Sequence, residues 1–362
     1  MDTLAQAKEF FMAGLAHYEA GRFDAADRQF SAALSLAPGR ASILTNLGAT
    51  RLKLAKFQDA ADLLAEAVQQ EPGNVEAWGH RATALAELGK HVEALASIDQ
   101  ALALEPAMGV GWSVRGTLLR ELGRKADAAT AFRQALAHGA DRELNSYYLA
   151  SLEEGAAPAT PPAGYVESLF DGYADGFEQH LVKVLNYRAP EVLVGELRRH
   201  GRTFDYALDL GCGTGLCGPL LRPMSRRLEG LDLSANMVRQ ARARGVYDEV
   251  RHGDAAQFLR SVDGRYDLIV AADVFIYVGA LDAVFEAAAG AMEPGGVTCF
   301  SVEKEEAQEF ALRSSLRYAH SARYLERLAA VHGFEVESRA EHPIREDQGA
   351  PIAGLFYWLV KR

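Results

Sequence analysis

A period of 34 residues in the first 140 residues constrains the fold of this 362-residue chain more than any other feature. Pro38, Pro72 and Pro106 keep this spacing. Two alanines and a large apolar residue repeat with the same step: Ala26, Ala60 and Ala94; Ala33, Ala67 and Ala101; Phe30, Leu64 and Ile98. Self-similarity at a fixed spacing of this length indicates units that stack on their neighbours and share a continuous core. The chain therefore begins as a solenoid of repeats.

The units resemble tetratricopeptide repeats, in which two antiparallel helices pack closely through small residues and a proline follows the second helix. A fourth unit keeps the phase through Gly116 and Phe132 but has Ala140 in the place of the proline. Residues 141–154 suit a helix that covers the last repeat. We therefore predict an all-α solenoid of four repeats and a capping helix over residues 1–154. Its role is either a groove for a protein partner or a scaffold that packs against the rest of the chain or another copy.

A break in composition separates this solenoid from a second domain. Residues 155–163 consist only of glycine, alanine, proline and threonine, and the stretch is too rich in proline and small residues to continue a helix. We predict a linker at 155–163 and a second domain at 164–362.

The stretch from Ala207 to Gly218 predicts a ligand-binding turn in the second domain. An apolar run with one acid, Asp209, precedes glycines at positions 211, 213 and 215. A strand that leads into a helix through glycines lets the backbone approach a ligand closely. Leu216 takes the place of the third glycine of a dinucleotide site, which disfavours NAD. For the glycines alone, a tight turn without a ligand is the alternative.

An acid follows each of the next three predicted strands. Asp232, Asp254 and Asp273 each lie at the end of a short predicted strand. The carboxyl ends of parallel strands meet at one edge of an open α/β sheet, where ligands bind, and an acid about 20 residues after the glycines can accept both hydroxyls of a ribose. An exposed acid without a ligand is the alternative for Asp232 and Asp254.

Taken together, these strand ends resemble the motifs of class I S-adenosylmethionine-dependent methyltransferases over about residues 165–362. The resemblance implies an α/β Rossmann-like domain with a seven-stranded mixed sheet, in which residues 334–338 and 355–360 form an antiparallel pair. The whole chain is most similar to bacterial proteins that join tetratricopeptide repeats to a methyltransferase domain.

The resemblance also implies S-adenosyl-L-methionine as the cofactor. Asp209 and Gly211 would hold its methionine end, Asp232 its ribose and Asp254 its adenine, while a helix before the first strand would supply Tyr173 to a lid. A helix that only packs its aromatic residues on the sheet is the alternative for that segment. The implied cofactor residues are Tyr173, Asp209, Gly211, Cys212, Gly213, Gly215, Asp232, Leu233, Met237, Asp254 and Ala255.

On the side of the methyl acceptor, the candidate catalytic residues are Asp273, Tyr277 and His320. His320 is predicted in a helix that opens near residue 314, where helix packing is the alternative role, and Arg317 of the same segment could hold an anionic substrate. A general base is needed only for a hydroxyl or a protonated amine, so the sequence leaves its use open. Residues 272–275 lack the Asn/Asp-Pro-Pro-Tyr of relatives that methylate amides and adenines, which disfavours those acceptors.

Composition excludes several other classes. A net charge of −11 disfavours nucleic acid as a partner, because phosphate binding needs a basic face. No apolar run approaches the roughly 18 residues of a membrane span, and no basic leader with an apolar core is present, so we expect a cytoplasmic protein. The three cysteines have no metal spacing and are expected to be reduced, and no metal site is predicted.

The sequence therefore predicts a methyltransferase that transfers a methyl group from S-adenosylmethionine to an unidentified small molecule. One alternative is a protein methyltransferase whose solenoid recruits the protein to be modified. The other is a non-catalytic scaffold that binds the cofactor.

Overall fold

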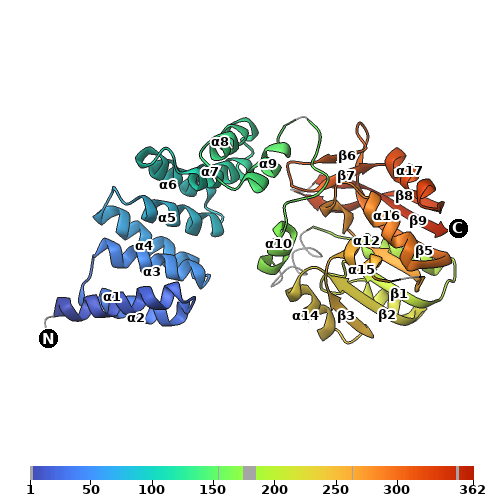
Figure 1. Cartoon of the computed structure of the whole chain (residues 1–362), viewed down its shortest axis with the longest axis horizontal. Helices are drawn as coiled ribbons and strands as arrows, with labels where there is room; N and C mark the ends of the chain where they lie inside the picture. The colour runs from blue at the N-terminus through green and yellow to red at the C-terminus, as the bar shows by residue number, and fades with distance from the viewer. Residues whose placement is uncertain (1–2, 154, 174–184, 263, 348–349) are drawn as a thin grey trace. The chain divides into compact units, whose positions relative to one another are not determined.

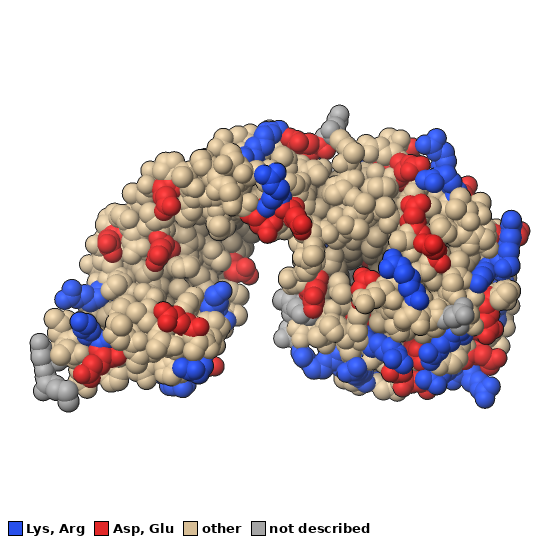
Figure 2. Space-filling model, in the orientation of Figure 1, with Lys and Arg blue, Asp and Glu red and all other residues tan. Residues whose placement is uncertain are grey.

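The computed structural model describes residues 3–153, 155–173, 185–262, 264–347 and 350–362. The chain divides into two compact units, Met1–Glu153 and Glu154–Arg362 (Figure 1). Figure 2 shows acidic and basic side chains interspersed on the visible face of the second unit, with no broad region of one sign on that face.

Within its described residues, the first unit is built from four helix pairs and a ninth helix (Figure 1). The pairs are α1 (Thr3–Glu19) with α2 (Phe23–Leu36), α3 (Ala41–Lys53) with α4 (Phe57–Gln70), α5 (Val75–Glu87) with α6 (His91–Leu104), and α7 (Gly109–Glu121) with α8 (Lys125–Ala137). The ninth helix is α9 (Arg142–Ala150). The predicted all-α solenoid is confirmed.

The packing inside each pair explains the period of the sequence. In the last pair, the fully buried Phe132 of α8 lies over Gly116 of α7, where an added Cβ would come within 2.5 Å of the Phe132 ring. The same arrangement joins Phe30 to Gly14 and Leu64 to Gly48. The third pair has the buried Ala82 and Ile98 at the same positions. Close-packed interiors tolerate little change in volume, so a large residue and a small one recur in step.

Helix α9 covers the last pair. Asp141 caps its N-terminus, because the Asp141 carboxylate accepts a hydrogen bond of 2.8 Å from the Leu144 N–H. The Tyr148 ring lies 5.2 Å from the Phe132 ring, so the helix buries the apolar edge that a further repeat would otherwise cover.

The second unit is an α/β domain around one mixed sheet. Its strands are β1 (Phe204–Leu210), β2 (Ser225–Asp232), β3 (Glu249–His252), β4 (Tyr266–Ala271), β5 (Met292–Glu305), β6 (Phe310–Leu312), β7 (Tyr318–Ser321), β8 (Phe334–Asp347) and β9 (Ala350–Lys361). The first five strands pair in parallel in the order β3-β2-β1-β4-β5. Strand β9 then pairs antiparallel with β5, and β8 antiparallel with β9, as predicted.

The described sheet has nine strands, two more than the seven predicted. The end of β5 extends beyond its pairing with β9 and pairs in parallel with the short β7, which pairs antiparallel with β6. This extension changes the strand count and leaves the order of the main strands intact.

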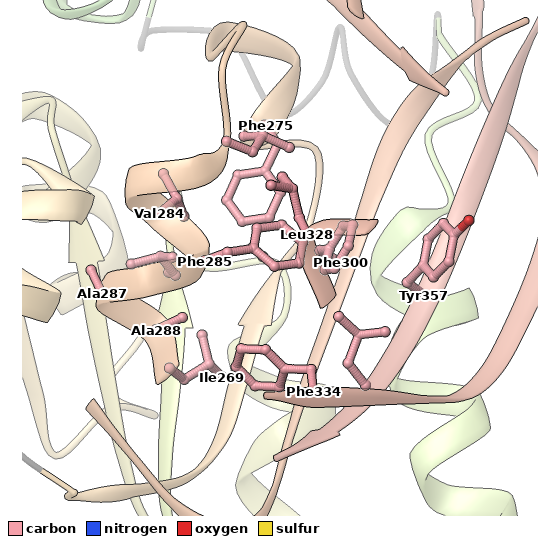
Figure 3. Packing of buried hydrophobic residues seen from close by; sticks show 14 of the residues in the cluster. Ile269, Phe275, Val284, Phe285, Ala287, Ala288, Phe300, Leu328, Phe334 and Tyr357 are labelled. Carbon is pink, nitrogen blue, oxygen red and sulfur yellow. The ribbon is translucent and has the colours of Figure 1, made fainter. Parts of the chain in front are cut away.

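Helices cover both faces of this sheet (Figure 1). They are α12 (Ala189–Arg199), α13 (Gly218–Leu221), α14 (Ala235–Ala243), α15 (Ala255–Arg260), α16 (Asp282–Ala291) and α17 (Ala322–Val331), with 3-10 turns η2 (Arg222–Met224) and η3 (Phe275–Tyr277). A further helix, α10 (Tyr165–Tyr173), packs against α14. On one face, the Trp358 indole N–H donates to the Leu193 carbonyl and ties β9 to α12. On the other face, Phe275, Phe285, Phe300 and other apolar residues fill the space under α16 and α17 (Figure 3).

The helix predicted to open near residue 314 is wrong, because this segment turns back as the β6–β7 hairpin. The Arg313 N–H donates to the Arg317 carbonyl at 2.8 Å, and Leu316 takes a left-handed φ of 63°. The helix begins only after Ser321, whose hydroxyl caps α17 by accepting from the Tyr324 N–H. His320 is therefore a strand residue of β7.

We predict that Phe132→Ala destabilises the solenoid by about 3–5 kcal/mol, because it opens a cavity over Gly116. Trp78 and Trp112 report unfolding of the first unit in urea when Trp358 is replaced by Phe. The control is Leu104→Ala. Leu104 is 47% exposed, so this substitution should change the free energy of unfolding by less than about 0.5 kcal/mol. Equal effects of the two substitutions would contradict this account of the repeat packing.

Candidate active site

A cavity of about 770 Å³ lies at the carboxyl edge of the parallel strands. The residues that follow β1, β2, β3 and β4 line it, together with residues 160–164 and part of α10. Its size is in the range of small-molecule and cofactor sites.

The glycine turn after β1 forms the floor of this cavity. Gly211, Gly213 and Gly215 all have positive φ, between 54° and 88°. A Cβ on Gly211 would lie 2.5 Å from a methyl group of Val274, whereas Gly213 faces open space. The first glycine is therefore required by close packing, and the second leaves room for a ligand against the backbone. Gly215 does not line the cavity and packs against Arg244 and Tyr247.

Asp232, at the end of β2, ties the glycine turn to the next loop. One carboxylate oxygen accepts from the Gly213 N–H at 2.8 Å and the other from the Ser234 N–H at 2.9 Å. Burial raises the pKa of Asp232, although these backbone hydrogen bonds oppose the shift. Each carboxylate oxygen has a second lone pair, so the residue can still accept hydrogen bonds from a ligand.

Asp209 lies under the turn and is 1% exposed. The Tyr247 hydroxyl donates to it at 2.6 Å. Burial raises the pKa of Asp209 to about 7, the Tyr247 hydrogen bond lowers it, and the charge of Asp232 raises it further. A buried acid with this pKa carries its proton for part of the time near neutral pH.

The remaining predicted cofactor residues lie on the β2 and β3 side. The Asp254 carboxylate caps α15 by accepting from the Gln257 N–H at 2.8 Å, and Met237 is buried in the first turn of α14. Tyr173 ends α10, and its side chain lies outside the described residues. The predicted cofactor residues that line the cavity are Asp209, Gly211, Cys212, Gly213, Asp232, Leu233, Met237, Asp254 and Ala255.

On the β4 side, Asp273 belongs to a buried ion cluster. It has a left-handed φ of 60°, and its N–H donates to the Ser301 hydroxyl at 2.9 Å. The guanidinium of Arg345, which is 2% exposed, donates to Asp273 Oδ2 at 2.8 Å and also to Glu303. Among the described residues, Asp273 Oδ1 and Arg345 Nε have no hydrogen-bond partner.

Tyr277 and Arg317 also line the cavity on this side. Burial raises the pKa of Tyr277, while the positive charge of Arg317 and a hydrogen bond between the two side chains lower it. Tyr277 is therefore protonated at neutral pH and available as a hydrogen-bond donor.

His320 does not line the cavity. It is fully buried in β7, and its Nε2 donates to the Gly279 carbonyl at 2.9 Å. Burial lowers the pKa of His320 to about 4, so it is neutral at pH 7. This correction follows from the hairpin that replaces the predicted helix, because the strand turns His320 toward the Gly279 turn.

Sequence reasoning missed three contributors to the cavity: Arg345, Tyr187 and residues 160–164. Arg345 and Tyr187 lie far along the chain from any recognised motif, so no local spacing marks them. The linking segment is held by the Ala280 N–H, which donates to the Ala159 carbonyl at 2.8 Å. Its proline-rich composition indicated only a boundary.

The described part of the chain contains no group of three or more His, Cys, Asp or Glu side chains arranged to hold a metal ion. None of its described helices combines the length and hydropathy needed to cross a bilayer.

The sheet order and the acids at its carboxyl edge define an α/β domain of the class I methyltransferase type. Residues 207–296 match the family model for a methyltransferase domain, and residues 11–54 and 46–108 match that for a tetratricopeptide repeat. The chain therefore joins tetratricopeptide repeats to a methyltransferase domain.

Two curated relatives also have methyltransferase names. Methyltransferase-like protein 27 of Homo sapiens is 30% identical over 161 residues, covering 40% of this chain and 61% of that protein. The dTDP-3-amino-3,6-dideoxy-alpha-D-glucopyranose N,N-dimethyltransferase of Streptomyces fradiae is 31% identical over 152 residues, covering 40% and 57%. The chain thus spans about three fifths of the length of these curated relatives. The solved structure of the N-methyltransferase NodS from Bradyrhizobium japonicum is 19% identical, covers 46% of this chain and 83% of that chain, and has a TM-score of 0.38.

We predict that Asp209→Asn flattens the pH dependence of stability of the second unit. The folded pKa of about 7 lies above the ordinary value of 3.8, so the bound proton stabilises the folded state at low pH, and this contribution is lost as pH rises through about 7. Between pH 5 and pH 8, the free energy of unfolding of the unaltered protein should fall by about 2 kcal/mol more than that of Asp209→Asn.

Urea unfolding followed by Trp358 fluorescence, with Trp78 and Trp112 replaced by Phe, measures this difference. Asp205→Asn is the matched control, because the Asp205 side chain is 83% exposed at the other end of β1. If Asp209→Asn and Asp205→Asn gave the same pH dependence, the Asp209 pKa would not be raised.

Proposed function

We propose that the protein transfers a methyl group from S-adenosyl-L-methionine to a small-molecule acceptor. The observation that carries this proposal is the position of Asp232 at the cavity. Its two carboxylate oxygens accept hydrogen bonds from backbone N–H groups of the turns that follow β1 and β2. This arrangement fixes a carboxylate beside a glycine floor, as recognition of a ribose requires. The match of residues 207–296 to a methyltransferase domain supports the same reaction class.

The residues present fit this cofactor. The open space over Gly213 accommodates a ligand, and Asp232 would accept from the ribose hydroxyls. Asp254 and Met237 would contact the adenine, and Asp209 would lie toward the methionine end. When bound, S-adenosylmethionine supplies a methyl group on a positively charged sulfur, and transfer leaves the neutral thioether S-adenosylhomocysteine.

The protein then has to orient the acceptor and exclude water. Asp273 is the candidate to receive the proton that an acceptor O–H or N–H loses as its oxygen or nitrogen gains the methyl group. Arg345 fixes one oxygen of Asp273, and the other has no partner among the described residues. Tyr277 would donate a hydrogen bond to the acceptor. The three free, buried cysteines suit a reducing compartment, and we propose that the reaction takes place in the cytoplasm.

We predict that Asp232→Ala weakens binding of S-adenosylhomocysteine by about 10- to 100-fold, because a hydrogen bond to a charged group contributes about 1.5–3 kcal/mol. Isothermal titration calorimetry on the full chain measures the affinity. Asp205→Ala removes an exposed acid from the same sheet and should leave the affinity within about twofold. A folded protein that binds neither S-adenosylmethionine nor S-adenosylhomocysteine would overturn the proposal.

A second candidate function is methylation of a protein that the repeats recruit. The observation that favours it is the short stretch of chain between the end of α9 at Ala150 and the cavity wall at residues 160–164. Tetratricopeptide repeats are commonly used for protein interaction, and a partner held there would be tethered to the cavity.

Deletion of residues 1–154 distinguishes these functions. It should leave small-molecule turnover roughly unchanged and abolish methylation of a protein acceptor, as measured by transfer of labelled methyl groups in a cell extract. The deletion must end before residue 155, because residues 160–164 line the cavity. Cofactor binding without transfer to any compound of the extract would instead favour a non-catalytic scaffold.

A further inference from the structure

Arg317 is held at the cavity by a rigid turn. It lies in the β6–β7 hairpin, where its carbonyl accepts from the Arg313 N–H and the Leu316 N–H donates to the Arg313 carbonyl, both at 2.8 Å. The positive φ of Leu316 closes this turn. The Arg317 side chain lines the cavity on the side of Asp273 and Tyr277.

Among the described residues, no carboxylate lies within 4.0 Å of the Arg317 guanidinium, whereas its neighbours in the cluster are paired. Arg313, on the same hairpin, lies 2.7 Å from Glu305. Arg345 is shared between Asp273 and Glu303. Arg317 forms a hydrogen bond with the Tyr277 side chain. This bond uses only part of the five N–H donors of the guanidinium.

The charges on this side of the cavity do not oppose an anion. Among the described residues, the two carboxyl groups of Asp273 and Glu303 are matched in number by the guanidiniums of Arg345 and Arg317. In addition, Arg345 Nε is a donor without an acceptor and Asp273 Oδ1 an acceptor without a donor, within the described part of the chain. Buried polar atoms are usually hydrogen-bonded, so these two suit a ligand that has both an acceptor group and a donor group.

We propose that the methyl acceptor carries an anionic oxygen group, a carboxylate or a phosphate, that Arg317 binds, and an O–H or N–H that faces Asp273. This inference rests on the proposed methyltransferase function and names its substrate class. A guanidinium suits this role because its planar fork matches the two oxygens of a carboxylate or phosphate.

The test titrates the full chain, saturated with S-adenosylhomocysteine, with sodium acetate and with inorganic phosphate at constant ionic strength. Calorimetry or thermal shift should detect binding of at least one anion in the unaltered protein. Arg317→Gln should weaken that binding at least tenfold. Arg317→Lys, which keeps the charge without the fork, should weaken it less. Arg313→Gln removes the same charge from the same hairpin and should change it less than twofold.

Binding of acetate alone identifies a carboxylate acceptor, and binding of phosphate alone a phosphorylated one. The inference is overturned if neither anion binds, or if Arg313→Gln weakens binding as much as Arg317→Gln. Affinity for S-adenosylhomocysteine is measured in every variant and shows that the domain is folded. If the unaltered protein does not bind S-adenosylhomocysteine, the proposed function fails, and the same titration without it still decides whether Arg317 holds an anion.

Discussion

The parallel pairing of β1 with β2 on one side and β4 on the other is the constraint on which the cavity depends. Asp209 pairs with Gly230 of β2 and Val270 of β4, so the three strands end at nearly the same level. The loops that follow them then meet at one edge. Asp232 joins two of these loops through backbone hydrogen bonds. A shift in the register of one strand would therefore displace the glycine turn from the acid that supports it.

Two buried acids of the second unit, Glu229 within β2 and Asp273 after β4, differ in how far the protein uses their hydrogen-bonding capacity. Glu229 is fully buried, and its oxygens accept from Arg265, Tyr206 and Tyr266. Such an acid contributes structure, because its hydrogen-bonding capacity is used within the protein. In contrast, Asp273 retains an oxygen without a partner among the described residues. The free oxygen of Asp273 therefore marks the β4 side of the cavity as the place where a ligand can complete the hydrogen bonding.

Local patterns in the sequence predicted most of the fold and part of the site. The 34-residue period predicted the helix pairs because each large residue of a second helix, such as Phe132, needs a small residue at a fixed place on the first helix. The predicted strand ends at Asp209, Asp232 and Asp254 indicated one edge of the cavity, whereas the order of the strands in the sheet was not predicted. The β6–β7 hairpin escaped prediction because residues 318–321 are held as a strand by the end of β5, a contact between distant segments. Arg345 escaped for the same reason, since its partner Asp273 lies 72 residues earlier in the chain.

The segment between the two units belongs physically to the second. The Ala159 carbonyl accepts from Ala280, and an added Cβ on Gly279 would come within 2.7 Å of the Pro158 carbonyl. His320 also holds this turn, because its Nε2 donates a hydrogen bond to the Gly279 carbonyl. Pro158 and Ala159 thus contact the loop after η3. The chain before them runs back to the end of α9 at Ala150. The covalent chain therefore joins the last helix of the first unit to a wall of the cavity.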